Sequence, residues 1–284
     1  GSGFMFGDTP YSNLTSNAAN GNMYGFYIYG SPNSTLYNNT AIGNGNATVG
    51  SGFMILDPGR VNVTGNEARN NSYGFTVINS QNNTLANNNA YNNSKTGFEA
   101  RTGFASKDTI FPDNNVFRGN TAYNNSDGFI VYSGDNTTMA DNAAYNPGGF
   151  GFVLYLASNC NLTNNSVNSS YTAFLVGTSS FKTPSDAKFK NYTANNTALN
   201  NEARNSSIGF MLYPANNTSL TDNRIHDNVE NGIIVLQSNT TSLTSDHLYN
   251  NGLDLFFNAT SGGYGINLST VIFDNPSGNL TNFT

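Results

Sequence analysis

Residues 74–93 read GFTVINSQNNTLANNNAYNN and contain the pattern that decides the fold. Phe75 and Val77 alternate with their neighbours, Leu85 follows an Asn-Asn-Thr turn signal, and Ala90 lies in a third piece that ends in an Asn-Asn pair. Alternation over a few residues, bounded by Asn, Gly and Ser, is typical of short strands joined by tight turns. The stretch therefore predicts three short strands separated by turns.

The same unit recurs along the whole chain, and most copies open with Gly-Phe. Roughly eleven copies follow one another at a spacing of about 22 residues, which is within the range typical of solenoids. Each copy places apolar residues at matching positions of its three pieces. Because one copy cannot bury its apolar side alone, successive copies must stack and share an interior. The sequence predicts an all-β solenoid of roughly eleven coils.

One column of the repeat is polar and nearly uniform, and its last member is Asp246. Its other members are Asn17, Asn39, Asn66, Asn88, Asn120, Asn142, Asn165, Asn201 and Asn223. An amide carries both a donor and an acceptor, so identical amides at strand spacing can bond along the stack. We interpret the column as a structural asparagine ladder at a turn. The alternative is a row of ligand-binding amides.

The 284 residues include only 10% charged side chains, with a formal net charge of −6. Lys and Arg are sparse and scattered, which argues against nucleic acid as a partner. No signal peptide and no apolar run of membrane-spanning length is visible, so we expect no membrane span. We predict one β-helix domain over residues 1–284, with insertions near 100–114 and 177–193. Such insertions are either tolerated loops or the walls of a binding face.

The outward positions of the first strand are mostly apolar, where a solvated strand would be polar. An apolar stripe of this kind is typical of an interaction surface, covered by the insertions or by another molecule. The interface candidates are Met54, Ile130, Tyr132, Val153, Tyr155, Leu175, Met211, Tyr213, Ile234 and Leu236. An alternative is that tyrosines of this face stack on carbohydrate, and these are Tyr27, Tyr29, Tyr132, Tyr155 and Tyr213.

Asn-x-Ser/Thr sequons occur more than twenty times. The glycosylation candidates are Asn13, Asn33, Asn62, Asn82, Asn124, Asn161, Asn191, Asn216, Asn239 and Asn267. Turn chemistry itself favours Asn-Asn-Thr, yet this density fits a secreted protein better than a cytoplasmic one. We therefore expect an extracellular or cell-surface glycoprotein with N-linked glycans.

Metal ligands are few, and we expect no cofactor. The two histidines, His226 and His247, fall in different columns of adjacent copies, so we expect them to face opposite sides. A zinc-type site needs same-side ligands and a third partner. Asp222, Asp227 and Asp246 form the best set for a hard cation such as Ca²⁺, which would bind only weakly.

Catalytic groups are also few, and we expect no enzyme activity. The single cysteine, Cys160, occupies a strand position expected to point into the interior, so it is predicted to be buried and inert. A glycosidase needs two carboxylates across a groove. Glu67 and Glu202 lie several copies apart, which is too far at about 4.8 Å per copy. Asp135 and Asp141 flank one short strand, and we interpret them as solvated turn residues.

The Gly-Phe-x-apolar, Asn-Asn-Thr-Leu and Asn-x-Ala-Tyr-Asn-Asn motifs of residues 74–93 and 120–131 resemble the parallel β-helix repeats of the pectin-lyase-like superfamily. They are most similar to NosD-type repeats and to surface proteins of methanogenic archaea. The resemblance implies a right-handed parallel β-helix with three parallel sheets. The superfamily includes polysaccharide lyases and hydrolases, but their Asp-Asp, His-Gly and basic motifs are absent. NosD-type proteins are associated with copper, but this chain has only two His and one Cys.

We therefore predict a secreted structural protein, a self-assembling subunit of a cell-surface layer, sheath or filament. Its partner would be other copies of the chain, joined end to end or side by side. The alternative is a carbohydrate-binding or carbohydrate-active β-helix protein.

Overall fold

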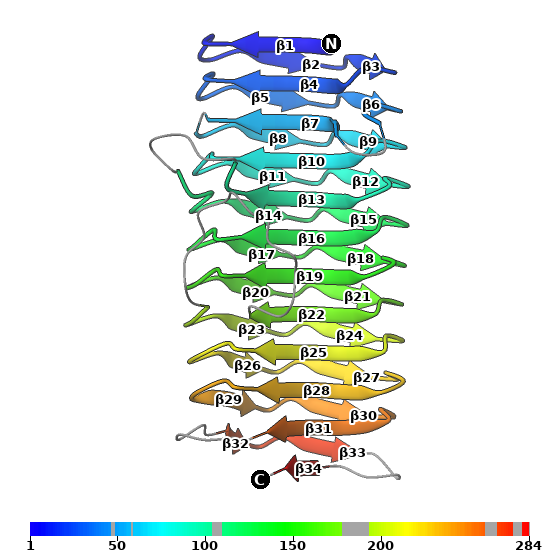
Figure 1. The fold of residues 1–284 in the computed structure, drawn as a ribbon, viewed down its shortest axis with the longest axis vertical. Coiled ribbons are helices and arrows are strands. Elements are labelled where there is room, and N and C mark those ends of the chain that lie inside the picture. The colour runs from blue at the N-terminus through cyan, green and yellow to red at the C-terminus, as the bar shows by residue number, and fades with distance from the viewer. Residues whose placement is uncertain are drawn as a thin grey trace.

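The computed structural model describes residues 1–46, 49–57, 59–103, 110–177, 193–258, 266–274 and 280–283, the last range as backbone only. The chain coils into a solenoid with β1 and β34 at opposite ends of its long axis (Figure 1). Three parallel sheets of twelve, eleven and eleven strands run along it. This confirms the predicted all-β solenoid, and the described residues contain no helix.

Each coil contributes one strand to each sheet, and we name the sheets A, B and C. Sheet A contains β1 (Ser2–Gly7), β4 (Tyr24–Tyr29), β7 (Ser51–Leu56), β10 (Tyr73–Ile78), β13 (Thr96–Arg101), β16 (Asp127–Tyr132), β19 (Phe150–Tyr155), β22 (Thr172–Gly177), β25 (Ile208–Tyr213), β28 (Asn231–Leu236), β31 (Leu253–Asn258) and β34 (Leu280–Phe283). Sheet B contains β2 (Asn13–Thr15), β5 (Thr35–Tyr37), β8 (Asn62–Thr64), β11 (Thr84–Ala86), β14 (Val116–Arg118), β17 (Thr138–Ala140), β20 (Asn161–Thr163), β23 (Thr197–Leu199), β26 (Ser219–Thr221), β29 (Thr241–Thr244) and β32 (Ile266–Ser269). Sheet C contains β3 (Ala18–Asn20), β6 (Thr40–Ile42), β9 (Glu67–Arg69), β12 (Asn89–Tyr91), β15 (Thr121–Tyr123), β18 (Ala143–Tyr145), β21 (Ser166–Asn168), β24 (Glu202–Arg204), β27 (Arg224–His226), β30 (His247–Tyr249) and β33 (Ile272–Asp274).

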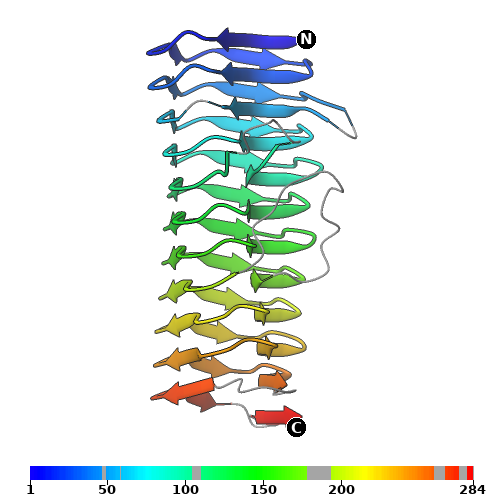
Figure 2. The ribbon, with the colours of Figure 1, turned by 60° about the vertical axis from the view of Figure 1, so that its left-hand side comes forward.

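Equivalent strands of successive coils lie side by side, as both views show (Figure 1, Figure 2). Phe75 pairs with Phe53 on one side and Phe98 on the other, and their rings stack 4.7 and 4.8 Å apart. The ring spacing equals the strand spacing, so the backbone pairing itself brings the rings into contact. This phenylalanine stack runs from Phe4 to Phe210 through the continuous buried core.

The asparagine ladder is present as predicted. Asn88 donates from Nδ2 to Asn120 Oδ1 at 3.0 Å and to the Val63 carbonyl at 2.9 Å. Its own Oδ1 accepts the backbone and side-chain N–H groups of Asn66. Each amide therefore bonds to both neighbouring coils, which satisfies polar backbone groups at a buried corner.

A second ladder, which we did not predict, lies at the corner between sheets C and A. Asn44, Asn71, Asn93 and Asn125 are joined by Nδ2–Oδ1 bonds of 2.9 to 3.1 Å. Asn228 and Asn251 repeat the arrangement further along. Asn83 and Asn115 stack in the same way before sheet B, so asparagines bond between coils at all three corners.

The frequent Asn-Asn pairs have a stereochemical cause. Asn87 and Asn92 have φ of 54° and 52°, and the next residues, Asn88 and Asn93, are ladder members. Asn adopts the left-handed region more readily than other non-glycine residues. The first Asn of a pair thus turns the chain, and the second stabilises the corner.

Parts of both predicted insertions lie outside the described residues, namely 104–109 and 178–192. The three sheets continue through the coils on either side of them.

Replacing Asn88 with alanine removes the hydrogen bonds of the Asn66 backbone N–H and of the Val63 carbonyl, both on the preceding coil, whereas Asn120 Oδ1 keeps the Asn88 backbone N–H. Each orphaned group costs about 1–3 kcal/mol, so we expect a loss of about 2–4 kcal/mol in the free energy of unfolding. Urea denaturation followed by circular dichroism measures it. Asn89→Ala is the matched control, because Asn89 is exposed and should change stability by less than about 0.5 kcal/mol. Equal losses in both variants would contradict the ladder's role.

The ladder ends on a carboxyl group, which should make stability depend on pH. Asp246 Oδ1 accepts from the N and Nδ2 of Asn223, whereas Oδ2 is buried without a hydrogen-bond partner. Burial raises the pKa of Asp246 to about 6, although the bonds from Asn223 oppose the rise. Because the folded-state pKa lies above the unfolded value of about 3.9, the folded state holds the proton more tightly. Stability should be greatest below about pH 4 and fall as the pH rises to about 6.

In Asp246→Asn this fall should disappear, and stability above pH 6 should rise on the order of 2–3 kcal/mol. The new amide should donate to the Leu220 carbonyl, because Asn223 donates to the equivalent Ala198 carbonyl one coil earlier. Thermal unfolding at pH 4 and pH 7 tests this. Asp222→Asn, at an exposed neighbour, keeps the Asp246 carboxyl and should retain most of the fall. A fall that disappears in Asp222→Asn but persists in Asp246→Asn would contradict the assignment to Asp246.

Candidate functional site

The outer face of sheet A carries a group of ionisable side chains on β10, β13 and β16. Because Phe98 and Ala100 point into the core, Glu99 and Arg101 of the same strand point outward. The adjacent strands β10 and β16 pair with β13 on either side. We call this group the Glu99 cluster, and its members are Tyr73, Lys95, Glu99, Arg101, Asp127 and Tyr132.

The geometry of the cluster is set by a few contacts. Arg101 Nε lies 3.2 Å from Glu99 Oε2, and the Glu99 residue is only 5% exposed. Lys95 Nζ lies 4.8 Å from the centre of the Tyr73 ring, a cation–π contact. Asp127 Oδ1 accepts the backbone N–H of Phe150 at 2.9 Å.

Burial shifts the acid–base properties of these groups. It raises the pKa of Glu99, against the opposing charge and hydrogen bond of Arg101. It also raises the pKa of Asp127, where the Phe150 N–H opposes the shift. Burial, with the Glu99 charge adding to it, raises the pKa of Tyr73 to about 12, and the same two causes raise that of Tyr132.

The cluster thus combines carboxyls that retain a proton to higher pH, two cations and two phenols. Burial makes the two carboxyls hold their protons more tightly than exposed carboxyls, and the cations can bind an anion. Cationic, carboxyl and phenol groups thus share one face over three adjacent coils. This is the strongest candidate site among the described residues.

Sequence reasoning did not single out this cluster. Glu99 is a charged member of the otherwise mostly apolar outward column of the first strand. A charged residue in such a column, followed two positions later by Arg101, was the available signal. Tyr73 and Asp127 occupy the same repeat position, two residues before Phe75 and Phe129, and Lys95 lies one position further from Phe98. Nothing in the repeat marks these positions as polar partners of Glu99, so the register had to show that they meet.

The predicted interface residues divide into two sets. Met54, Ile130, Val153, Tyr155 and Leu175 are buried, and the last four form a cluster of their own on sheet A. The chain itself therefore covers this part of the stripe, and contact with another molecule stays a prediction for the rest. The partly exposed members are Tyr132, Met211, Tyr213, Ile234 and Leu236.

The other surface candidates are placed as follows. Of the glycosylation candidates, those exposed are Asn13, Asn62, Asn82, Asn124, Asn161, Asn216 and Asn267. Asn33 and Asn239 are half-buried, and Asn191 lies outside the described residues. Among the predicted stacking tyrosines Tyr155 is buried, and Tyr29 is the most exposed.

The two histidines lie on the same face of sheet C, so the predicted opposite orientation is wrong. They flank the inward Ile225 and Leu248, on opposite sides along the strand, and both therefore point outward. His226 is buried between Glu202 Oε1 at 3.2 Å and Asp227 Oδ2 at 2.6 Å. The Asp227 bond to His226 lowers the pKa of that carboxyl.

The remaining candidates are held in structural contacts. Cys160 is buried, with Sγ 3.3 Å from the Gly134 carbonyl. Glu67 and Glu202 are five coils apart, about 24 Å at the usual strand spacing.

Of the predicted turn aspartates, Asp135 Oδ1 accepts the Ser158 N–H at 2.8 Å. Asp141 pairs with Arg118, so each of the two has its own partner. Asp222 is exposed, whereas Asp246 is buried in the ladder. Over the described ranges, no three His, Cys, Asp or Glu residues are arranged to hold a metal ion.

The family model described as "Periplasmic copper-binding protein (NosD)" matches residues 1–111 and 185–282. The chain belongs to the NosD family. A second model, "Right handed beta helix region", matches residues 109–193 and agrees with the handedness implied by the repeats. No curated protein matches this NosD-family chain.

Solved structures share its fold at low sequence identity. The A-module of a mannuronan C-5 epimerase from Azotobacter vinelandii is 16% identical, with a TM-score of 0.62 over 95% of this chain and 90% of that one. An alginate lyase from Paenibacillus sp. is 11% identical, with a TM-score of 0.63 over 93% of each chain. A surface adhesin of Streptococcus pneumoniae is 10% identical, with a TM-score of 0.68 over 93% of this chain and 71% of that one. At these identities the likeness establishes the pectin-lyase-like β-helix fold.

The family's description implies copper, but the described residues do not fit it. Copper in proteins prefers Cys, Met and His ligands. Cys160 is buried with its thiol against backbone carbonyls, and His226 is enclosed by two carboxylates. Within the part of the chain that the structure describes, no helix is long and apolar enough to cross a bilayer.

The mutual influence of the cluster residues can be measured directly. Glu99→Gln removes a negative charge that raises the pKa of Tyr73, and it frees Arg101, which lowers that pKa. The pKa of Tyr73 should therefore fall below about 12, while burial, the largest cause of its rise, keeps it above the ordinary value near 10. Carbon-13 NMR of labelled tyrosine, assigned with Tyr73→Phe, follows the titration. Glu67→Gln on sheet C is the control, and a Tyr73 pKa that moves only with Glu67 would contradict the cluster.

Proposed function

We propose that this NosD-family protein binds an acidic, uronate-containing polysaccharide at the Glu99 cluster on sheet A. The proposal rests on one observation. Lys95 and Arg101 lie on the same face as the half-buried phenols of Tyr73 and Tyr132, which belong to adjacent coils. Guanidinium and ammonium groups bind carboxylates through charge-assisted hydrogen bonds. Partly buried tyrosines offer sugar rings both an apolar face and a hydroxyl.

The carboxyls of the cluster suit a polyanionic ligand. Burial raises the pKa of Glu99 and of Asp127, so both hold a proton to higher pH than an exposed carboxyl. A protonated carboxyl donates a hydrogen bond to a uronate instead of repelling it. The same groups could exchange a proton with a bound sugar, and turnover of the polysaccharide is one outcome of the test below.

The printed descriptions of structural neighbours support this choice of ligand. They include a mannuronan epimerase, an alginate lyase and a periplasmic alginate epimerase, and mannuronan and alginate are polyuronates. We place the protein outside the cytoplasm, because the family is described as periplasmic and one neighbour is a surface adhesin. Exposed sequons are compatible with that location.

Removing either cation should weaken binding to polyuronate. A hydrogen bond to a charged group is worth about 1.5–3 kcal/mol, so Arg101→Gln or Lys95→Gln should reduce affinity at least about tenfold. Calorimetry with alginate and polygalacturonate oligomers, at two salt concentrations, measures the loss. Uronic acid products in the same samples would reveal turnover.

Arg118→Gln is the matched control for this experiment. Arg118 pairs with Asp141 at 3.2 Å, the distance found for Arg101 and Glu99, but it lies on sheet B and is 70% exposed. Its loss should leave affinity unchanged. Equal binding of neutral dextran, or equal losses in the Arg101 and Arg118 variants, would refute the proposal.

A second proposal, self-assembly into a surface layer, sheath or filament, rests on the remaining apolar stripe. Met211 of β25 pairs with Ile234 of β28, and both are partly exposed, as are Tyr213 and Leu236. Lateral contact between copies of the chain would bury them. Electron microscopy at high protein concentration should show ordered assemblies that Met211→Lys with Ile234→Lys abolishes. A monodisperse monomer throughout would exclude this role.

A further inference from the structure

Arg101 of the Glu99 cluster already makes hydrogen bonds on both of the edges that can bind a carboxylate. Its Nε donates to Glu99 Oε2 at 3.2 Å, and its Nη1 donates to the Thr102 carbonyl at 3.3 Å. A guanidinium binds a carboxylate with two parallel N–H groups, either Nε with Nη2 or Nη1 with Nη2. Each pair is half occupied in Arg101, so an incoming carboxylate can use only Nη2 as long as both contacts persist.

The Glu99 carboxyl that occupies Nε is shielded from solvent. The Glu99 residue is only 5% exposed and lies between Thr76 of β10 and Ile130 of β16, with which it pairs. Thr76 Oγ1 bonds to Ser51 Oγ at 2.9 Å, and the Ile130 side chain has no polar atom. Among the described residues, Arg101 is therefore the one hydrogen-bond partner of the Glu99 side chain.

Protonation of Glu99 would change what Arg101 can bind. An ionised carboxyl accepts a charge-assisted hydrogen bond from Nε, whereas a protonated carboxyl is neutral and holds a cation only weakly. Burial favours the neutral form and raises the pKa of Glu99, although Arg101 opposes the rise. The backbone carbonyl of Thr102 does not titrate, so of the two contacts only the one with Glu99 can be released by a proton.

Other charged and titratable groups face Glu99 from the strands around it. They are Tyr73 from β10, Lys95 from the turn before β13, and Asp127 and Tyr132 from β16. Burial raises the pKa of both tyrosines above its ordinary value, so neither titrates near neutral pH. Asp127 is the other carboxyl of the cluster, and its Oδ1 accepts the Phe150 N–H.

We propose that polyuronate binding at this cluster is coupled to protonation of Glu99, which releases the Nε–Nη2 edge of Arg101 for a two-point contact with a ligand carboxylate. Because it rests on the proposed function, this coupling requires that the cluster bind polyuronate at all. Binding would draw a proton onto Glu99, so affinity should rise as the pH falls. One linked proton corresponds to a change of up to about tenfold in affinity per pH unit.

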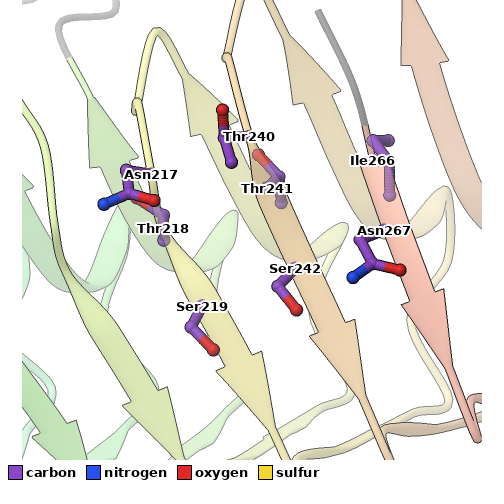
Figure 3. Close-up of a pocket in the computed structure, with 8 residues that line it drawn as sticks. All are labelled: Asn217, Thr218, Ser219, Thr240, Thr241, Ser242, Ile266 and Asn267. Carbon is purple, nitrogen blue, oxygen red and sulfur yellow. The ribbon is translucent and has the colours of Figure 1, made fainter.

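Proton uptake would also identify where the ligand binds. The shallow pocket on sheet B between β26 and β32 is lined by hydroxyl and amide side chains and by Ile266, and none of its lining residues is ionisable (Figure 3). Binding in that pocket would therefore involve no proton uptake by the residues that line it.

Calorimetry of the whole chain with alginate and polygalacturonate oligomers tests this coupling. Titrations at about pH 5 and about pH 8, each in two buffers of different ionisation enthalpy, give the affinity and the number of protons taken up. We expect tighter binding at the lower pH, and uptake approaching one proton per site at the higher pH. Glu99→Gln, which is neutral at every pH, should bind about tenfold more tightly than wild type at the higher pH and take up fewer protons.

Glu67→Gln is the matched control, because Glu67 accepts from Arg69 Nε at 2.9 Å with the same spacing along the strand but lies half-buried on sheet C. It should keep the affinity and the proton uptake of wild type. Binding without proton uptake, equal effects of the two Gln variants, or uptake lost in Asp127→Asn but kept in Glu99→Gln would overturn the coupling alone. Absence of any polyuronate binding would refute the proposed function, and the coupling with it.

Discussion

The corner hydrogen bonds between stacked amides are the interaction on which this structure depends. Each coil must change direction three times, and every change leaves backbone groups that the strands cannot satisfy. Asn66, Asn88 and Asn120 show the solution, because each amide bonds to the next coil and to a carbonyl of the previous one. The spacing of these amides keeps the three sheets in one register, and the register in turn stacks the phenylalanine rings.

A solenoid held together in this way leaves its outer faces free to vary. The inward positions repeat from coil to coil, whereas Thr76, Glu99 and Ile130 occupy one outward column on three neighbouring coils. Function can therefore be added to a face without disturbing the core. Sheet A carries the ionisable cluster and sheet B the hydroxyl-lined pocket, so two chemically different surfaces share one scaffold.

The family description and the side chains of this protein suggest different ligands. The NosD description refers to copper, yet the described residues provide no cluster of metal ligands. The neighbours in structure include proteins that act on polyuronates, and the Glu99 cluster has groups suited to such a ligand. For a fold that hosts many activities, the residues on the outer face are the better guide.

The sequence by itself determined the solenoid, its coils, its phenylalanine column and its first ladder. It could do so because these features repeat, and a repeat converts one local pattern into many independent observations. The second ladder at Asn71 and Asn93 was missed because Pro147, Ser170 and Ser206 interrupt its column. The repeat also led to the wrong orientation for the histidines. In a strand of three residues whose middle residue points inward, the first and third residues both point outward, so His247 and His226 share a face.

Only the tertiary structure decided the sites. Tyr73, Glu99 and Asp127 lie in three different coils, and the lengths of the intervening turns set how they align. The burial that raises the pKa of Glu99 depends on what surrounds the strand in space. A site that occurs once does not follow the repeat, so the periodicity of the sequence cannot reveal it. Finding it requires the contacts between side chains of neighbouring coils.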